Sequence, residues 1–173
     1  MTDRTEQPAF WAEPEVRYIG AEESLAHLEE VWSAGCFDGI LGFSQGGTAA
    51  ALLAARLERR GCANLPRFVI VCAGFRTPLP TNSELDWWRA AAVGPEGAPL
   101  ATPALFVVGE RDVVTPPSQT RQLAALFADA TVHEVRGGQH AMPQQAADLT
   151  AVRGFLERIR ASTPASGPAR AAL

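Results

Sequence analysis

Short apolar runs alternate with helical segments along most of this chain, and that alternation limits the folds open to it. Four runs are too short for a helix and rich enough in apolar residues to be buried, so each predicts a strand. They are FDGILGF at 37–43, RFVIVCAGF at 67–75, PALFVVGE at 103–110 and TVHEVRGG at 131–138. Buried strands separated by helices form a parallel sheet with helices on both faces. We therefore predict the α/β class, as a three-layer sandwich with a mostly parallel sheet.

The segments between the strands carry apolar residues at the spacing of a helix. Helices are predicted over 21–35, 45–61, 83–92, 116–130 and 142–162. Glycine is expected to end the first two helices, at Gly35 and Gly61. Leu25, Leu28, Val31 and Trp32 recur at helical spacing in the first helix, and Leu52, Leu53 and Leu57 are expected to face inward in the second.

The length and composition of the chain are typical of one globular domain. It has 173 residues, of which 47% are hydrophobic and 20% charged. We predict an irregular lead-in over 1–20, a folded domain over 21–161 and a disordered tail over 162–173. A net charge of −4, with basic residues scattered along the chain, argues against nucleic acid as a partner.

Further sequence features bear on the compartment. The apolar stretch 39–55 contains Ser-Gln-Gly-Gly at its centre, which argues against a membrane span. Cys36, Cys62 and Cys72 have no metal-type spacing, so we expect reduced thiols, with Cys72 buried, and no bound metal. The polar start of the chain lacks the apolar core of a secretory signal. These features together predict a cytoplasmic protein.

The motif Gly-x-Ser-x-Gly, formed by Gly42, Ser44 and Gly46, lies where the first predicted strand meets the second predicted helix. A nucleophilic serine needs such a sharp turn to project its hydroxyl above a sheet, with glycine on either side to avoid collisions. The amides of Gln45 and Gly46 would then face the reacting carbonyl and act as oxyanion- or substrate-binding groups. The other interpretation of the motif is an ordinary turn of small residues.

Two further polar residues follow predicted strands. Asp112 comes just after the third strand, where Glu110 competes for the same role, and His140 comes after the fourth. The carboxyl ends of parallel strands meet at one edge of a sheet, so Ser44, Asp112 and His140 are expected to converge there. Their chain order, Ser, Asp, His, is that of α/β-hydrolases. His27 is expected on the surface, and His133 is expected to be structural.

Several segments together resemble the FSH family of serine hydrolases. They are YIGAEESLAHLEEV, FDGILGFSQGG, RFVIVCAGF, GERDVVTPPSQTRQLAALF and GGQHAMP, within residues 17–160. The resemblance implies an α/β-hydrolase fold and a cytosolic esterase or thioesterase that needs no cofactor and acts on a small acyl substrate. It gives Ser44 the role of nucleophile, Asp112 that of acid and His140 that of base. Acyl-protein thioesterases share Gly-Phe-Ser-Gln-Gly-Gly but fit less well elsewhere.

The chain departs from the family pattern in two places. Gln139 is inserted between Gly138 and His140, where the family has Gly-Gly-His, and the insertion is expected to shift the imidazole. The family also begins with further strands and a His-Gly loop that carries the second oxyanion donor, so the domain is predicted to be N-terminally truncated. The sheet edge beside Ser44 would then be exposed and able to pair with another chain, including a second copy.

Three functions are therefore compatible with the sequence. The first is a Ser-His-Asp hydrolase of acyl esters or thioesters, with Trp87 and Trp88 as candidate walls of the acyl pocket. The second is a catalytically impaired remnant that binds a ligand or a protein. The third is an α/β domain whose serine turn is fortuitous.

Overall fold

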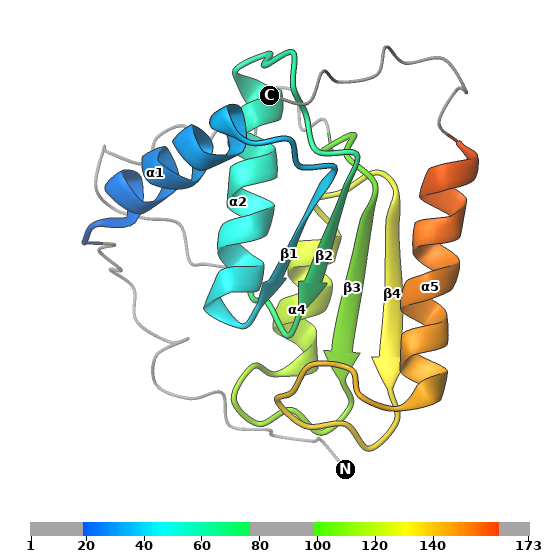
Figure 1. Ribbon diagram of the computed structural model, residues 1–173. Helices are drawn as coiled ribbons and strands as arrows, with labels where there is room; N and C mark the ends of the chain where they lie inside the picture. The colour runs from blue at the N-terminus through cyan, green and yellow to red at the C-terminus, as the bar shows by residue number, and fades with distance from the viewer. Residues whose placement is uncertain (1–18, 77–98, 163–173) are drawn as a thin grey trace.

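The computed structural model describes residues 19–76 and 99–162, and Figure 1 shows them in colour. The elements are α1 (Ala21–Ala34), β1 (Gly39–Phe43), α2 (Gln45–Arg59), β2 (Phe68–Cys72), β3 (Ala104–Gly109), α4 (Pro117–Ala124), β4 (Ala130–Val135) and α5 (Ala146–Ala161). All four predicted strands are confirmed. The helix predicted over 83–92 lies outside the described residues, as do Trp87 and Trp88.

The strands form one parallel sheet in the order β1-β2-β3-β4. Phe43 is in register with Cys72, Cys72 with Val107, and Gly109 with Val135. The carboxyl ends of the strands therefore meet at one edge of the sheet, which is the lower edge in Figure 1. The predicted α/β class and parallel sheet are confirmed.

Helices cover both faces of the sheet, which gives three layers (Figure 1). On one face α2 and α4 enclose a core that includes Val71, Phe106 and Leu123. On the other face α5 packs Phe155 and Ile159 against a core that includes Leu105. Every residue of β3 is buried, because this strand has a neighbour on each side and helices above and below. No helix in the described ranges is long and apolar enough to cross a membrane.

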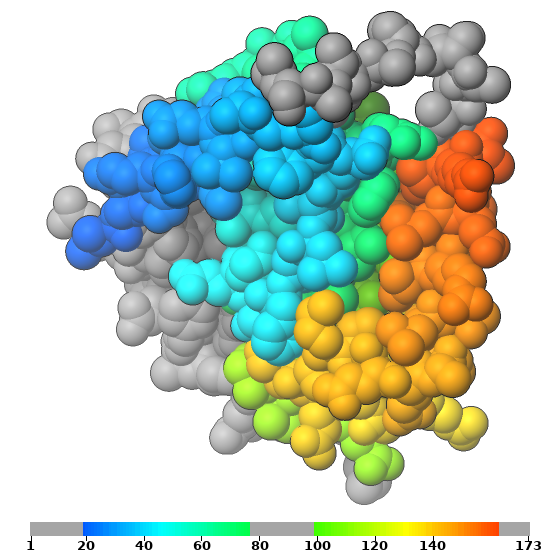
Figure 2. Space-filling view, in the orientation of Figure 1, coloured from blue at the N-terminus to red at the C-terminus, as the bar shows by residue number. Residues whose placement is uncertain are grey.

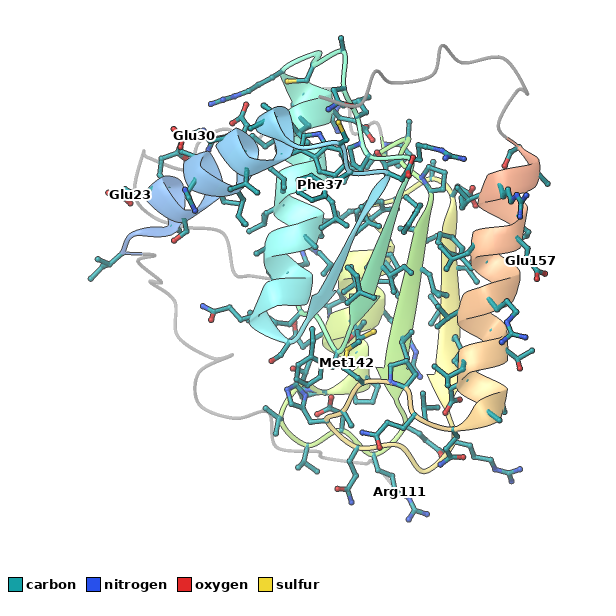
Figure 3. All side chains as sticks on the ribbon, in the orientation of Figure 1. Glu23, Glu30, Phe37, Arg111, Met142 and Glu157 are labelled. Atoms are coloured by element: carbon teal, nitrogen blue, oxygen red, sulfur yellow. The ribbon has the colours of Figure 1, made fainter. Side chains whose placement is uncertain are left out.

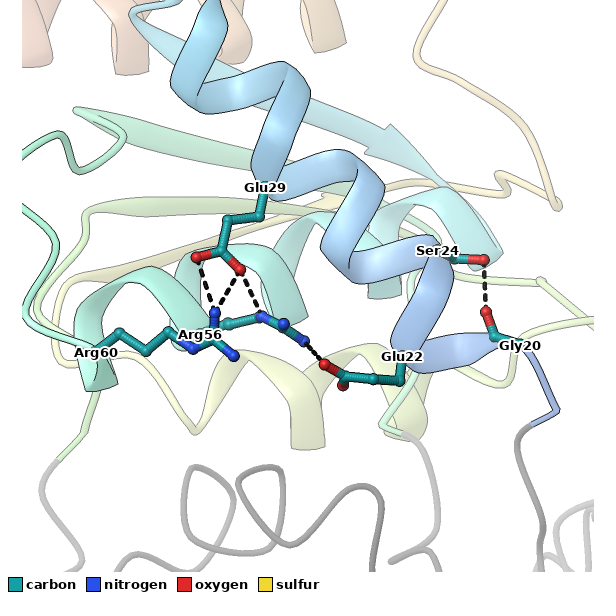
Figure 4. A network of polar contacts seen from close by, with 6 residues as sticks. All are labelled: Gly20, Glu22, Ser24, Glu29, Arg56 and Arg60. Atoms are coloured by element: carbon teal, nitrogen blue, oxygen red, sulfur yellow. Dashed lines mark hydrogen bonds and ion pairs between the residues drawn. The ribbon is translucent and has the colours of Figure 1, made fainter.

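Helix α1 packs on α2 and is tied to it by charged groups. Arg56 is only 4% exposed, and its guanidinium bonds to the carboxylates of Glu22 and Glu29, as Figure 4 shows. Burial alone lowers the pKa of Arg56, but the hydrogen bonds and charges of Glu22 and Glu29 outweigh that effect, and the pKa is raised. Arg60 adds a second contact to Glu29.

The apolar residues that recur at helical spacing in α1 are not all covered. Leu25 and Trp32 are buried, whereas Leu28 and Val31 are 37% and 44% exposed. A narrow stripe of α1 packs against Leu53 and Leu57 of α2. Only the α1 residues on that stripe are covered. Helix α2 itself follows the prediction, ending beside Gly61, whose φ of 64° suits glycine.

Strand β1 is not the buried strand that its apolar sequence predicts. Leu41 is 56% exposed and Phe43 37%, on the face of the sheet that α5 covers farther along. Figure 2 shows β1 and β2 open to view between α1 and α5. Within the described residues β1 has only β2 as a neighbour, so it forms an edge of the sheet.

Two helices are shorter than predicted. Helix α4 ends at Ala124 rather than continuing to 130, because Phe127 forms an isolated parallel bridge with Leu100, which lies just before β3. Helix α5 begins at Ala146 rather than at 142, since Pro143 and the extended Gln145 precede it. The segment left outside α5 belongs to the loop that carries His140.

Candidate active site

Ser44 occupies the turn between β1 and α2, as the motif predicted. Its backbone has φ 53° and ψ −124°, a region that L-residues rarely adopt and that costs about 1–3 kcal/mol. Two backbone hydrogen bonds hold the turn, from the Ser44 amide to the Cys72 carbonyl (2.8 Å) and from the Thr48 amide to the Ser44 carbonyl (3.1 Å). The side chain is half-buried, so it remains reachable from solvent.

The two glycines of the motif serve different purposes. A Cβ on Gly42 would lie 2.5 Å from the carbonyl carbon of Gly46 and 2.7 Å from the Cα of Gly47, so β1 and α2 touch there through bare backbone. Gly46 has nothing within 4 Å of a Cβ. The predicted avoidance of collisions therefore holds at Gly42 and not at Gly46, where open space lies beside the Ser44 turn.

Asp112 lies in the loop after β3, with a side chain only 1% exposed. Its Oδ1 accepts the amides of Val114 (2.9 Å) and Thr115 (2.7 Å), an arrangement that fixes the carboxylate within its own loop. Its Oδ2 lies 2.8 Å from Nδ1 of His140. Asp112 rather than Glu110 therefore faces the histidine.

His140 joins the two other predicted residues. Its Nε2 lies 3.0 Å from Oγ of Ser44, while its Nδ1 contacts Asp112. The expected shift of the imidazole by Gln139 is wrong, because the ring reaches both partners. Three side chains from separate strand ends thus form one hydrogen-bonded line above the edge of the sheet.

Backbone contacts explain how the extra residue is accommodated. The amide of Arg111 donates to the carbonyl of Gly138 (2.7 Å), and the amide of Gly137 donates to the carboxylate of Glu110 (2.6 Å). A Cβ on Gly109 would collide with the carbonyl oxygens of Gly138, at 2.9 Å, and Gln139. The loop with Asp112 and the loop with His140 therefore hold each other through close backbone contact.

A third loop lies beside the serine, after β2. Ala73 has φ 50°, a second strained position at this edge. Thr120 donates to the carbonyl of Gly74 (2.6 Å), and the Thr48 hydroxyl bonds both backbone groups of Phe75. These two threonines fix the segment next to Ser44.

Sequence reasoning assigned no site role to Phe43, Thr48 or Thr120, and it suggested Glu110 only as a rival of Asp112. The ring of Phe43 lies 4.9 Å from the imidazole of His140, and Thr48, Thr120 and Glu110 anchor loops around it. Phe43 lies inside the serine motif and Thr48 two residues after it, so their position was the available signal. No feature of the sequence around Thr120 indicates a role at the site. Figure 3 labels Arg111 and Met142 at the lower edge of the sheet, and Phe37, which precedes β1, at its upper end.

Other titratable groups have separate roles. Burial raises the pKa of the Cys72 thiol to about 11, consistent with its prediction as a buried thiol. His27 is exposed as predicted, and His133 bonds Asp148 at 2.8 Å, which ties β4 to α5. Among the residues that the structure describes, no group of three or more His, Cys, Asp or Glu side chains is placed to hold a metal ion.

Comparison with known proteins agrees with this geometry. The family model described as "Serine hydrolase (FSH1)" matches residues 1–152. The chain belongs to the FSH family of serine hydrolases. Esterase OVCA2 from Bos taurus is 37% identical over 143 residues, which cover 81% of this chain and 58% of that protein. An esterase from Aedes aegypti is 33% identical and covers 82% of this chain and 48% of that protein.

This FSH hydrolase also has the fold of solved α/β-hydrolases. The monoacylglycerol lipase of Paleococcus ferrophilus superposes with a TM-score of 0.57, covering 83% of this chain and 76% of that one, at 14% sequence identity. The likeness extends to the fold alone. The chain spans about half the length of the curated esterases that it matches.

Proposed function

We propose that the chain hydrolyses acyl esters or thioesters through Ser44, His140 and Asp112. Membership of a serine hydrolase family, and relatives named esterases, support a hydrolase of carboxylic esters. The observation that carries the finer proposal is the imidazole of His140, which lies within hydrogen-bond distance of both the Ser44 hydroxyl and the Asp112 carboxylate. A nucleophile, a base and a group that orients the base are the parts that acyl transfer needs.

In the first half-reaction Ser44 Oγ attacks the acyl carbonyl carbon while its proton passes to Nε2 of His140. The Asp112 carboxylate accepts the Nδ1–H and stabilises the imidazolium. When the tetrahedral intermediate collapses, the bond to the leaving oxygen or sulfur breaks, and Nε2 returns the proton to that atom. Water then attacks the acyl-enzyme with the same base, which releases the carboxylic acid and restores the Ser44 hydroxyl.

The negative charge on the tetrahedral oxygen needs donors that are already in place. The first amides of a helix have no acceptor within that helix, and they lie at the positive end of its dipole. In α2 these amides belong to Gln45 and Gly46, directly after the nucleophile. We assign them to the oxyanion, and the empty space beside Gly46 leaves room for it.

Exposed apolar side chains beside the site suit the acyl part of the substrate. Val113 and Val114, which follow Asp112, are 83% and 56% exposed. Large exposed apolar groups at a site rim are typical of surfaces that bind apolar ligands. We propose an apolar acyl group on a small-molecule ester, and the cytoplasm as the location of the reaction.

A fluorophosphonate probe, which reacts with activated serines, tests this function directly. The wild-type chain should be labelled and Ser44→Ala should not be, because the hydroxyl that attacks phosphorus is gone. Ser24→Ala is the matched control and should still be labelled, since Ser24 bonds only to the Gly20 carbonyl in α1. A folded wild-type chain that takes no label would overturn the proposal and favour a ligand-binding remnant.

A further inference from the structure

The ring of Phe43 packs against the imidazole of His140. The ring centroids lie 4.9 Å apart and the planes are inclined by 44°. Phe43 is the last residue of β1 and directly precedes Ser44, so the backbone that positions the nucleophile also positions this ring. The contact reaches the base from a different element than the one that supplies Asp112.

Within the described residues, Asp112 and Ser44 are the side chains that hydrogen-bond to the imidazole. The Asp112 carboxylate meets Nδ1, and the Ser44 hydroxyl meets Nε2. Of the charged neighbours in the loop after β3, the Glu110 carboxylate bonds the Gly137 amide, and Arg111 contributes its backbone amide to Gly138. Phe43 therefore adds a tilted ring-to-ring contact to the base, whereas Asp112 and Ser44 meet its two ring nitrogens.

An aromatic ring attracts a cation that lies over its face within about 6 Å of its centroid, and an aliphatic group of similar size provides no such attraction. We propose that Phe43 is a positioning residue, whose ring holds the His140 imidazole toward Ser44 and stabilises the imidazolium formed when Ser44 attacks. This inference rests on the proposed hydrolase function, because it assigns the imidazole a positive charge during turnover.

The test compares Phe43→Leu, which keeps an apolar side chain but removes the ring, with Phe43→Tyr, which keeps the ring. In Phe43→Leu, kcat for a chromogenic ester should fall about 2- to 5-fold with KM unchanged. The pH of half-maximal activity on the acid side should move down by about 0.4–0.7 unit, because the imidazolium is less stable. Phe43→Tyr should keep the wild-type kcat and the wild-type pH of half-maximal activity.

Leu41 supplies the matched control. It lies on the same strand, two residues earlier on the same face, and is 56% exposed. Leu41→Ala should leave kcat and the pH profile at wild-type values. If Phe43→Leu and Phe43→Tyr both match wild type in kcat and pH profile, the aromatic ring does not stabilise the imidazolium and the inference is overturned.

A measurement that needs no turnover separates this inference from the proposed function. Nuclear magnetic resonance follows the titration of the His140 ring in wild type, Phe43→Leu and Phe43→Tyr. A lower midpoint in Phe43→Leu alone supports the aromatic contact even in a chain that hydrolyses no ester. Equal midpoints in all three chains refute it, whereas an inactive wild type refutes the function.

Discussion

Replacing Gly42 with alanine tests whether bare backbone contact sets the nucleophile in place. The new methyl group would lie 2.5 Å from the carbonyl carbon of Gly46 and closer still to its oxygen. Ordinary contact begins at 3.4 Å, so β1 and the first turn of α2 must separate by about 0.9 Å or more. The neighbouring atoms are backbone, and therefore no side chain can rotate away.

The expected consequences follow from that displacement. Overpacking of this kind costs about 1–3 kcal/mol of unfolding free energy. The displaced turn contains Ser44, and a misplacement of about 1 Å in reacting groups lowers the rate on the order of 10²-fold. We therefore expect Gly42→Ala to lose far more activity than its loss of stability explains, as a folded protein with a misplaced serine.

The assay combines urea unfolding with kcat/KM for a chromogenic ester. Gly154→Ala is the matched control, because a Cβ there meets nothing within 4 Å on the exposed side of α5. It should keep wild-type activity and gain up to about 1 kcal/mol of stability from better helix propensity. A Gly42→Ala chain with wild-type activity would refute the claim that this contact positions Ser44.

Two further predictions concern groups around the site. Burial raises the pKa of the Cys72 thiol from 9.0 to about 11, so ionisation of this thiol favours the unfolded chain. The contribution of the neutral thiol to the free energy of unfolding is intact below pH 9. Above pH 9 it is lost at about 1.4 kcal/mol per pH unit, up to pH 11. The chain has no lysine to titrate in that interval. The free energy of unfolding, measured with urea at pH 8 and at pH 10.5, should fall between these pH values in wild type, and Cys72→Ala should remove this fall. An equal fall in the variant would contradict the role given to Cys72. Glu110→Ala removes the acceptor of the Gly137 amide and should lower kcat about 2- to 10-fold at constant KM, whereas Glu110→Gln keeps an acceptor oxygen and should retain most of the rate. Full activity in Glu110→Ala would show that the other contacts hold the loop without it.

The sequence was sufficient to predict the sheet and the convergence of the three site residues. Buried strands can be recognised from their apolar composition. Because functional residues of parallel sheets follow the carboxyl ends of the strands, Ser44, Asp112 and His140 are then predicted to lie at one edge. The boundaries of α4 and α5 were less accurate, because Phe127 and Pro143 act through tertiary contact and backbone restriction that periodicity does not register.

Contacts across the fold were beyond sequence reasoning. The exposure of Leu41 depends on which elements cover β1, and an apolar side chain has the same sequence signal whether covered or not. The displacement expected from Gln139 was wrong because Gly109, about 30 positions earlier, leaves the space that the inserted residue needs. A single sequence does not show that two such positions depend on each other.

The mutual contact of the loops after β3 and β4 has a consequence for protein engineering. Because Arg111 and Glu110 bond the backbone of the segment that ends in His140, neither loop has its shape independently of the other. Grafting residues 136–140 onto a related scaffold without residues 109–112 would transfer the histidine but not its location. Lengthening or shortening one loop in a library therefore calls for paired variation in the other, beginning at Gly109.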